Sequence, residues 1–298
     1  MFPGAKEDEV MDKMKVHRFR YFLKNYETLA GSGGILPMLK KSKWNYFKVP
    51  FFLLGEYFAL KKAVREIKPD IIHAHWIIPQ GFICALLPKK YKVPFVVTSH
   101  GSDIMGLKGF NGIKKFALRN AKKVTVVSNA LKEEVLKIDK GLNVEVIPMG
   151  VDTKLFNPNN RDLSIKKKYG INGPFLLFIG RLAPEKGIDL LIEAMPEVLK
   201  NQPKTKLMII GDGTLKEELK KRVKKLEISD NVIFVGWIDN KQLPKYYATA
   251  DVFVCPSRHE GFGLTFVEAG LCGCWLIGTK EGGIPDIIKD GKNGYLLK

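Results

Sequence analysis

The chain has 298 residues, of which 45% are hydrophobic and 27% are charged. This length suffices for two domains of ordinary size, and this apolar content excludes a chain that is disordered throughout. The 49 Lys and Arg outnumber the 31 Asp and Glu, and the first 165 residues alone carry a net charge of +13. Such a charge favours an anionic partner (nucleic acid, anionic lipid or a phosphorylated substrate) or simply a solvated lysine-rich surface.

Short apolar runs alternate with helical stretches along the chain. The expected strands are 16–22, 70–76, 94–100, 123–129, 144–149, 174–180, 206–211, 232–236, 252–257, 275–279 and 294–298. Amphipathic segments such as 187–202 and 214–228 separate most of them. Strands that are apolar throughout and alternate with helices are typical of parallel sheets covered on both faces. We therefore expect an α/β protein of two facing Rossmann-like, doubly wound domains, with a ligand cleft at the carboxyl ends of their strands.

The segment 152–174 is rich in Asn, Pro and Lys and predicts the domain boundary. We expect an N-terminal, acceptor-side domain over 1–165 and a C-terminal, nucleotide-sugar-binding domain over 166–298. The first lacks an opening strand with a glycine turn, and the second lacks a closing helix, so the sequence predicts truncation at both ends.

Composition also bears on the compartment. Four cysteines lie in apolar segments without a CxxC pair, which indicates reduced core thiols rather than a disulfide frame or a zinc site: Cys84, Cys255, Cys272 and Cys274. The chain has neither a run of about eighteen apolar residues nor the basic-then-apolar start of a signal peptide. A cytoplasmic protein is expected.

The segment GRLAPEKG (180–187) lies between an expected strand and an expected helix. A strand, a glycine turn and a helix N-terminus form an anion site from backbone amides and the helix dipole. Arg181 and Lys186 add two cations to this turn, which predicts a clamp on a diphosphate. The alternative is a pair of solvated loop cations. No GxGxxG follows a strand, so a dinucleotide fingerprint is excluded.

The segment EGFGLTFVE (260–268) follows the expected strand 252–257. Glycine lets the backbone approach a ligand closely, so Gly261, Phe262 and Gly263 are expected to present amides to the diphosphate at the start of a helix. Glu268, among apolar neighbours, suits the vicinal hydroxyls of a ribose. Glu260 is placed in the loop at the cleft, where a helix-capping acid is the alternative.

Histidines end two expected strands of the first domain. His100 ends 94–100 and is expected at the cleft, with Asp103 one turn on, at the acceptor side. His73 and His75 share a strand face, which admits a metal site, a lining of the acceptor pocket or plain packing. Because no carboxylate or cysteine stands at ligand spacing, the acceptor pocket is preferred and no metal is expected.

The segment 40–68 places lysines beside Trp44, Tyr46, Phe47 and Phe51. This pattern fits a helix that docks on an anionic membrane surface, and equally a partly buried helix with lysines along its rim. A peripheral position on the inner face of the cell membrane is one expectation. No zinc-finger, helix-turn-helix or RNP-type pattern accompanies the positive charge, so no nucleic-acid partner is expected.

These motifs, in this order, resemble the retaining family 4 glycosyltransferases (glycosyl transferases group 1) of the GT-B fold. The motifs that carry the resemblance are HGSD, VIPMGVD, GRLAPEKG, IIGDG, FVGWID, ADVFVCPS, EGFGLTFVE, GGIPD and DGKNGYLL. The chain departs from the family at Met149, where Asn is usual, and at Asp286, where Glu is usual. The missing glycine turn puts the activity of the chain in doubt.

The resemblance implies a division of roles. Arg181 and Lys186 would hold the diphosphate of a nucleotide sugar, Glu260 the sugar, and Glu268 the ribose, while the backbone around Ile238 would meet the base and His100 would sit over the reacting sugar. It also implies transfer to a hydroxyl acceptor with retained configuration, without metal or other cofactor, and UDP as the more frequent carrier. A scaffold that only binds the nucleotide sugar is the alternative, and a glycosidase that uses both glutamates is a weaker one.

Overall fold

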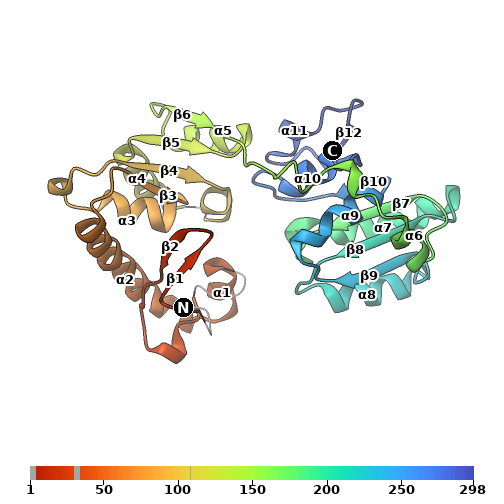
Figure 1. Cartoon of the computed structure of the whole chain (residues 1–298), viewed down its shortest axis with the longest axis horizontal. Coiled ribbons are helices and arrows are strands. Elements are labelled where there is room, and N and C mark those ends of the chain that lie inside the picture. The colour runs from red at the N-terminus through yellow and green to blue at the C-terminus, as the bar shows by residue number, and fades with distance from the viewer. Residues whose placement is uncertain (1–4, 30–33, 108) are drawn as a thin grey trace. The chain divides into compact units, whose positions relative to one another are not determined.

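The computed structural model describes residues 5–29, 34–107 and 109–298 and divides into two compact units (Figure 1). The first comprises 1–126 and 132–145, and the second comprises 127–131 and 146–298. The sequence places the division later, at 165. The difference arises because Phe156 and Ile165 are buried in the hydrophobic core of the second unit, so the segment before 165 packs there.

The first unit contains a four-stranded sheet in the order β3-β4-β5-β6, in which β3, β4 and β5 pair in parallel. Its strands are β3 (Ile72–His75), β4 (Phe95–Ser99), β5 (Lys123–Val126) and β6 (Val144–Val146), which confirms four of the expected runs. The helices of this part of the chain are α1 (Ile35–Lys41), α2 (Trp44–Ile67), α3 (Phe82–Ala85), α4 (Asn111–Asn120) and α5 (Asn129–Ile138). In the described ranges, none of the helices is both long and apolar enough to span a bilayer.

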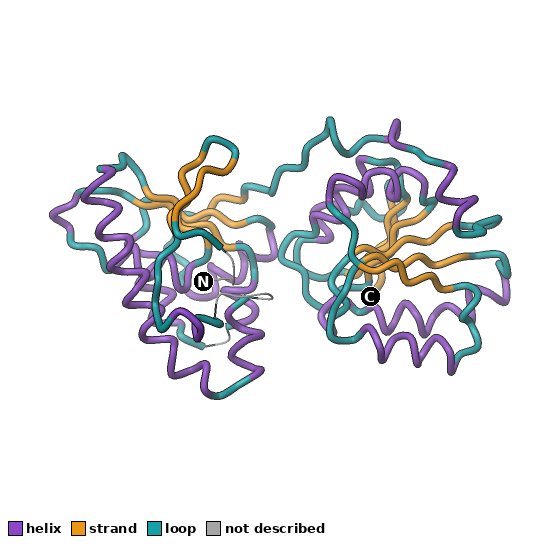
Figure 2. The backbone as a smooth tube through the Cα atoms, turned by 60° about the horizontal axis from the view of Figure 1, so that its bottom comes forward, coloured by secondary structure: helices purple, strands orange, loops and turns teal. Residues whose placement is uncertain are grey.

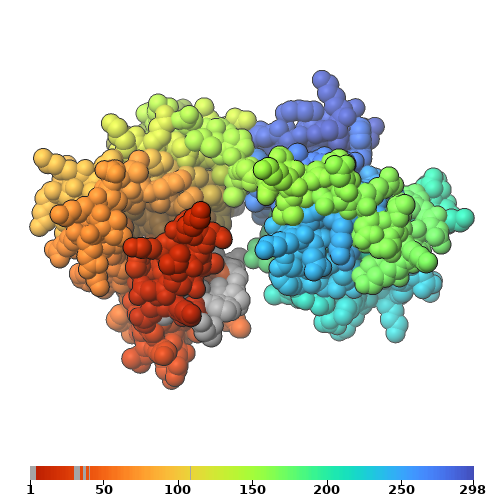
Figure 3. Space-filling view, in the orientation of Figure 1, coloured from red at the N-terminus to blue at the C-terminus, as the bar shows by residue number. Residues whose placement is uncertain are grey.

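The expected strand at 16–22 is wrong for most of its length. Two short antiparallel strands, β1 (Asp8–Met11) and β2 (Met14–His17), form a hairpin separate from the parallel sheet. Figure 3 shows this hairpin in dark red on the surface of the first unit. Beyond it, the amides of Tyr21 and Phe22 donate to the Glu27 carboxylate at 2.7 and 3.2 Å, so a side chain takes bonds that a neighbouring strand would otherwise receive.

The second unit contains a six-stranded sheet in the order β12-β11-β10-β7-β8-β9, in which all strand pairs are parallel. Its strands are β7 (Phe175–Ile179), β8 (Lys206–Ile210), β9 (Val232–Gly236), β10 (Val252–Cys255), β11 (Trp275–Thr279) and β12 (Gly294–Leu297). Its helices are α6 (Leu163–Lys168), α7 (Ile188–Asn201), α8 (Lys216–Lys225), α9 (Leu243–Thr249), α10 (Leu264–Leu271) and α11 (Ile284–Ile287). Figure 2 shows helices on both sides of this sheet, which explains why the central strand β7 is apolar throughout and β8 is apolar after Lys206.

The strand order creates a switch point between β7 and β10. From β7 the chain proceeds through β8 to β9 at one edge, and then returns to add β10, β11 and β12 on the other side of β7. At such a point two adjacent loops at the carboxyl ends of the strands diverge and leave room for a ligand. These two loops are 180–187 and 256–263, the segments singled out in the sequence.

The cysteines confirm the prediction of core thiols. All four are free and buried. Burial raises the pKa of the Cys84 and Cys274 thiols to about 12, so both are protonated at neutral pH.

Candidate active site

The two loops at the switch point are in direct contact. The Arg258 amide donates to Glu185 O over 2.9 Å, which ties the loop after β10 to the turn after β7. Gly187 has φ +63°, and a Cβ at this position would lie 1.9 Å from Pro256 O. Glycine is therefore required at 187 both for its backbone conformation and for the close approach of the second loop.

Lys186 and Glu260 form an ion pair across these loops. Lys186 Nζ lies 2.7 Å from Glu260 Oε2, and the two side chains are 22% and 13% exposed. Ser257 Oγ lies 3.5 Å from the same carboxylate oxygen. The sequence assigned Lys186 to a diphosphate and Glu260 to a sugar, and the structure places both at one point. Because an ammonium group has three donors, Lys186 can bond Glu260 and a phosphate oxygen together.

Arg181 also has a carboxylate partner. Its Nη2 atom lies 2.5 Å from Glu185 Oε1, and its side chain is 52% exposed. An exposed pair of this kind is weak and readily exchanges partners. The guanidinium thus remains available to an anion that reaches the turn after β7.

The Gly-Phe-Gly segment leads into α10 as expected. Gly263, at φ +102°, is the residue that precedes the helix, and Phe262 is buried, so only its backbone can face a ligand. Gly282 closes the segment from the other side, since a Cβ there would lie 1.6 Å from Glu260 O. The first amides of α10 lack partners within the helix and carry the positive end of its dipole, which suits an anion.

Glu268 lies half-buried on α10 and accepts a hydrogen bond from Tyr247 Oη over 2.9 Å. Burial raises the pKa of the Glu268 carboxyl, and the hydrogen bond from Tyr247 opposes that rise. Tyr247 itself is fully buried on α9. The tyrosine holds Oε2 in place, which leaves Oε1 as an acceptor for hydroxyl groups. Ile238 follows the carboxyl end of β9, and its partly buried side chain packs against the core.

The first unit carries the predicted histidines at the ends of β3 and β4. His75 Nδ1 lies 2.9 Å from His100 Nε2, and His73 Nε2 lies 2.7 Å from Thr98 Oγ1. Burial and the neighbouring imidazole of His73 lower the pKa of both His75 and His100, although Asp103 opposes the shift at His100. The pair is therefore neutral at pH 7 and shares one proton across its hydrogen bond.

Asp103 differs from its predicted acceptor-side place. The side chain is 2% exposed, and its two oxygens accept bonds from the Ile77 amide, Ser99 Oγ and the Gly101 amide. The carboxylate thus fixes the loop that follows His100 instead of facing an acceptor. Among the described residues, no cluster of three or more His, Cys, Asp or Glu is placed to hold a metal ion.

Comparisons with known proteins agree with this geometry. The model of the family "Glycosyl transferases group 1" matches residues 161–298, and that of "Glycosyltransferase Family 4" matches 20–155. An uncharacterized glycosyltransferase of Methanocaldococcus jannaschii is 32% identical over 268 residues, which cover 88% of this chain and 69% of that protein. The chain belongs to the group 1 glycosyltransferases.

Further relatives of this group 1 glycosyltransferase include the N-acetyl-alpha-D-glucosaminyl L-malate synthase of Bacillus anthracis, 30% identical over 86% of this chain and 68% of that protein. The structure of Anabaena HepE in complex with UDP superposes with a TM-score of 0.70 at 23% identity, over 82% of this chain and 68% of that one. The expected fold, two Rossmann-like domains of the GT-B class, is confirmed. The enzyme is a transferase that takes its sugar from a nucleotide sugar.

Sequence reasoning missed three residues of this candidate site. In the sequence Tyr247 has the pattern of an ordinary core aromatic, because its bond to Glu268 joins two helices and leaves no local signal. Ser257 stands three residues before Glu260 without a motif of its own. Arg258 did have a signal in the sequence. This cation stands two residues before Glu260, in the loop 256–263, and the acid Asp189 directly follows the other loop, 180–187.

Proposed function

We propose that this group 1 glycosyltransferase transfers a sugar from a nucleoside diphosphate sugar to a hydroxyl acceptor with retention of configuration. The observation that carries the proposal is the Lys186–Glu260 pair at the switch point, beside the N-terminus of α10. It sets a cation and helix amides where a diphosphate needs them and a carboxylate where a sugar hydroxyl would lie. UDP is the carrier that we propose first.

In the proposed reaction, the bond from the anomeric carbon to the leaving phosphate oxygen breaks through an oxocarbenium-like state. The acceptor hydroxyl attacks from the same face and forms the new carbon–oxygen bond, and its proton passes to the departing phosphate. Arg181, Lys186 and the amides of Gly261 to Gly263 stabilise the charge on the diphosphate. Each donor of this kind typically contributes about 3–4 kcal/mol to the transition state. Because these groups supply positive charge to the diphosphate, we propose that the enzyme works without a metal ion.

The remaining residues take roles around this centre. Glu268, oriented by Tyr247, accepts from the ribose hydroxyls, and the backbone at Ile238 meets the base. His75 and His100 are proposed to contact the sugar or the acceptor as neutral hydrogen-bonding groups. Glu260 accepts from hydroxyl groups of the transferred sugar while it stays paired with Lys186.

The test is release of nucleoside diphosphate from a panel of UDP and GDP sugars, with EDTA present in a parallel series. We expect release that depends on the sugar, survives EDTA and is lost in Glu260→Ala. A second candidate is a protein that binds the nucleotide sugar without turnover. Tight binding of a sugar nucleotide with no release of diphosphate, in the wild type as in Glu260→Ala, favours that candidate.

We also propose that α2 docks on an anionic membrane surface. One face of this helix packs into the first unit through Asn45, Lys48 and Phe52. On another part of it the side chains of Trp44, Tyr46, Phe47, Phe51, Leu54 and Phe58 are 40–62% exposed. Trp44 and Phe47 are stacked with ring centroids 5.4 Å apart. Exposed aromatic rings beside exposed lysines such as Lys43 suit the interface of an anionic bilayer.

Lys48 lies in the segment 40–68, which the sequence marks as a docking surface, but its side chain is not part of the exposed surface. It is 4% exposed, and its Nζ donates to Thr28 Oγ1 and Asn45 Oδ1. We expect co-sedimentation with phosphatidylglycerol vesicles that weakens with salt and is lost in Phe47→Ser/Phe51→Ser. Tyr295→Ser removes an aromatic ring that is 54% exposed in the second unit and serves as the control. Equal recovery with neutral and anionic vesicles would contradict the proposal.

A further inference from the structure

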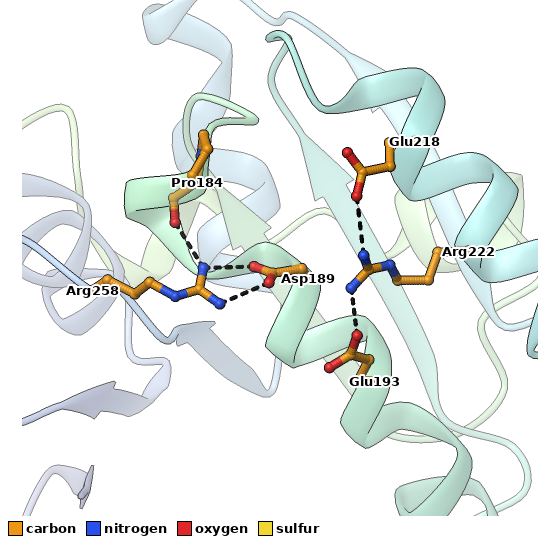
Figure 4. Close-up of polar contacts among 6 residues, drawn as sticks. All are labelled: Pro184, Asp189, Glu193, Glu218, Arg222 and Arg258. Carbon is orange, nitrogen blue, oxygen red and sulfur yellow. Dashed lines mark hydrogen bonds and ion pairs between the residues drawn. The ribbon is translucent and has the colours of Figure 1, made fainter.

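Arg258 joins the two loops that carry Lys186 and Glu260. Its Nη1 atom donates to Asp189 Oδ1 and to Pro184 O, each over 2.8 Å, and its Nη2 atom donates to Asp189 Oδ2 over 2.7 Å (Figure 4). A guanidinium that bonds both oxygens of one carboxylate fixes direction as well as distance. The Arg258 side chain is 39% exposed and that of Asp189 is 22% exposed.

The acceptors of Arg258 stand on both sides of Lys186 in the chain. Pro184 starts the three-residue 3-10 turn that ends at Lys186, and Asp189 lies in the first turn of α7. From the loop after β10, the guanidinium therefore holds the turn that presents the Lys186 ammonium. Because Glu260 is only two residues from Arg258, this contact sets the separation of the two charged groups of the site.

The same bonds argue against a direct contact of Arg258 with the donor. Three of the five N–H donors of its guanidinium bond within the fold and fix its plane, whereas Lys186 and Arg181 each bond a single carboxylate oxygen. The hydrogen bond from Arg258 lowers the pKa of the Asp189 carboxyl and keeps it ionised, although the partial burial of Asp189 opposes this shift. A cation so placed acts through the residues that it holds.

We propose that Arg258, through Asp189 and Pro184 O, is a positioning residue that holds Lys186 and Glu260 at the separation that donor binding requires. This inference rests on the proposed function, since it concerns the same donor site. A misplacement of about 1 Å in such a site can cost about a hundredfold in rate, so the geometry of the pair has a large effect.

Arg222 provides a matched control within the same unit. It also bonds two oxygens of acidic side chains, with Nη2 3.0 Å from Glu218 Oε1 and Nη1 bonded to Glu193 (Figure 4). Its side chain is 29% exposed, similar to that of Arg258. Its bond to Glu193 connects α8 to α7, and its bond to Glu218 lies within α8, so neither reaches the two loops of the site. Arg222→Ala thus removes a comparable arginine bridge without reaching Lys186 or Glu260.

The experiment uses the full chain with Arg258→Ala, Arg258→Lys and Arg222→Ala. Hydrogen–deuterium exchange without ligand reports the peptides 184–190 and 256–262, and calorimetric titration with UDP, GDP and their sugar conjugates reports donor affinity. We expect Arg258→Ala to speed exchange in both peptides and to weaken the best-binding donor by about tenfold or more. Arg258→Lys should fall between this variant and the wild type, and Arg222→Ala should change neither readout.

A second comparison separates positioning from general loosening. In a Lys186→Ala background the pair whose separation Arg258 sets no longer exists, so Arg258→Ala should then weaken binding by no more than about twofold. The same tenfold loss in both backgrounds overturns the inference, as does unchanged exchange in Arg258→Ala. Unchanged affinity in Arg258→Ala, with a wild type that binds, also overturns it. A wild type that binds none of the nucleotides refutes the proposed function instead, and the exchange data still decide whether Arg258 joins the loops.

Discussion

Lys186 and Glu260, which are 74 residues apart in the chain, form an ion pair with 2.7 Å between Nζ and Oε2. Both side chains are largely shielded from solvent, so the pair is stronger than an exposed one and costly to break on one side only. The pairing also means that the groups assigned to the diphosphate and to the sugar influence each other's position. This relationship determines how variants at the two positions should combine.

We expect Lys186→Met and Glu260→Gln to be strongly non-additive in stability. Each single change leaves an uncompensated group and should lower the free energy of unfolding by about 1–3 kcal/mol. The double variant removes both groups and should lose less than the sum by about 1 kcal/mol or more. Urea denaturation of the four proteins measures this coupling, and additive losses would show that the pair contributes nothing to the fold.

The Tyr247 hydroxyl is expected to affect donor affinity through Glu268. Tyr247→Phe removes the bond to Oε2, so the carboxylate is less fixed and more readily protonated, and the Kd for the nucleoside diphosphate should rise about three- to tenfold. Tyr246→Phe is the control, because Tyr246 lies beside Tyr247 on α9 and its hydroxyl interacts with Tyr169 instead of Glu268. Titration calorimetry distinguishes the two variants, and equal affinities would remove Tyr247 from the site.

The sequence suffices to predict most of the fold for a physical reason. Central strands that are buried on both faces need apolar runs, as β7 and most of β8 show. Ten of the eleven expected strands lie in the four-stranded and six-stranded sheets. The exception, 16–22, carries two arginines, Arg18 and Arg20, and the amides of Tyr21 and Phe22 donate to the Glu27 carboxylate. A competing side-chain acceptor of this kind leaves no local signal.

The site is less predictable because it depends on strand order. Nothing local in 180–187 or 256–263 states that β7 and β10 are neighbours, so the contact of Lys186 with Glu260 emerges only from the assembled sheet. Asp103 shows the opposite case: an acid after a strand resembles a site residue in sequence, yet its oxygens are used by backbone and serine donors.

The histidine pair predicts an acid limit to activity. Because burial and His73 lower the pKa of His75 and His100, both rings are neutral at pH 7, and activity should fall only below the usual histidine value of about 6.5. Protonation of both would put two cations at hydrogen-bond distance. His73→Gln removes one source of repulsion, so the acid limb of the kcat/KM profile should move to higher pH. A limb that lies above 6.5 in the wild type would contradict this assignment.

Glu56 on α2 should make stability depend on pH. Burial raises the pKa of its carboxyl from 4.5 to about 7, and its Oε2 atom is among the few buried side-chain oxygens without a partner in the described part of the chain. The folded state therefore holds a proton that the unfolded state releases, so stability is highest below pH 4.5 for this group and falls as pH rises to about 7. The loss is at most about 3 kcal/mol.

Glu56→Gln removes this dependence. The gain in unfolding free energy over the wild type should be near zero at pH 4.5 and grow up to pH 7.5, because only the wild type must then ionise a buried group. Glu66→Gln on the same helix changes a side chain that is 63% exposed and should show no such trend. Denaturation midpoints across this pH range provide the measurement, and a gain that is constant with pH would refute the assignment.

Gly282 and Gly291 allow a test of how closely the loop of Glu260 is packed. Both have positive φ, +54° and +73°, so alanine is strained at either position. At 282 the new Cβ would also lie 1.6 Å from Glu260 O, whereas at 291 it meets no atom within 4 Å.

Gly291→Ala should therefore cost about 1 kcal/mol of stability and leave diphosphate release intact. Gly282→Ala must displace the Glu260 backbone, so it should lose release by about a hundredfold even at temperatures where it stays folded. Circular dichroism and the release assay separate the two effects, and equal activity of both variants would mean that the Glu260 loop tolerates displacement.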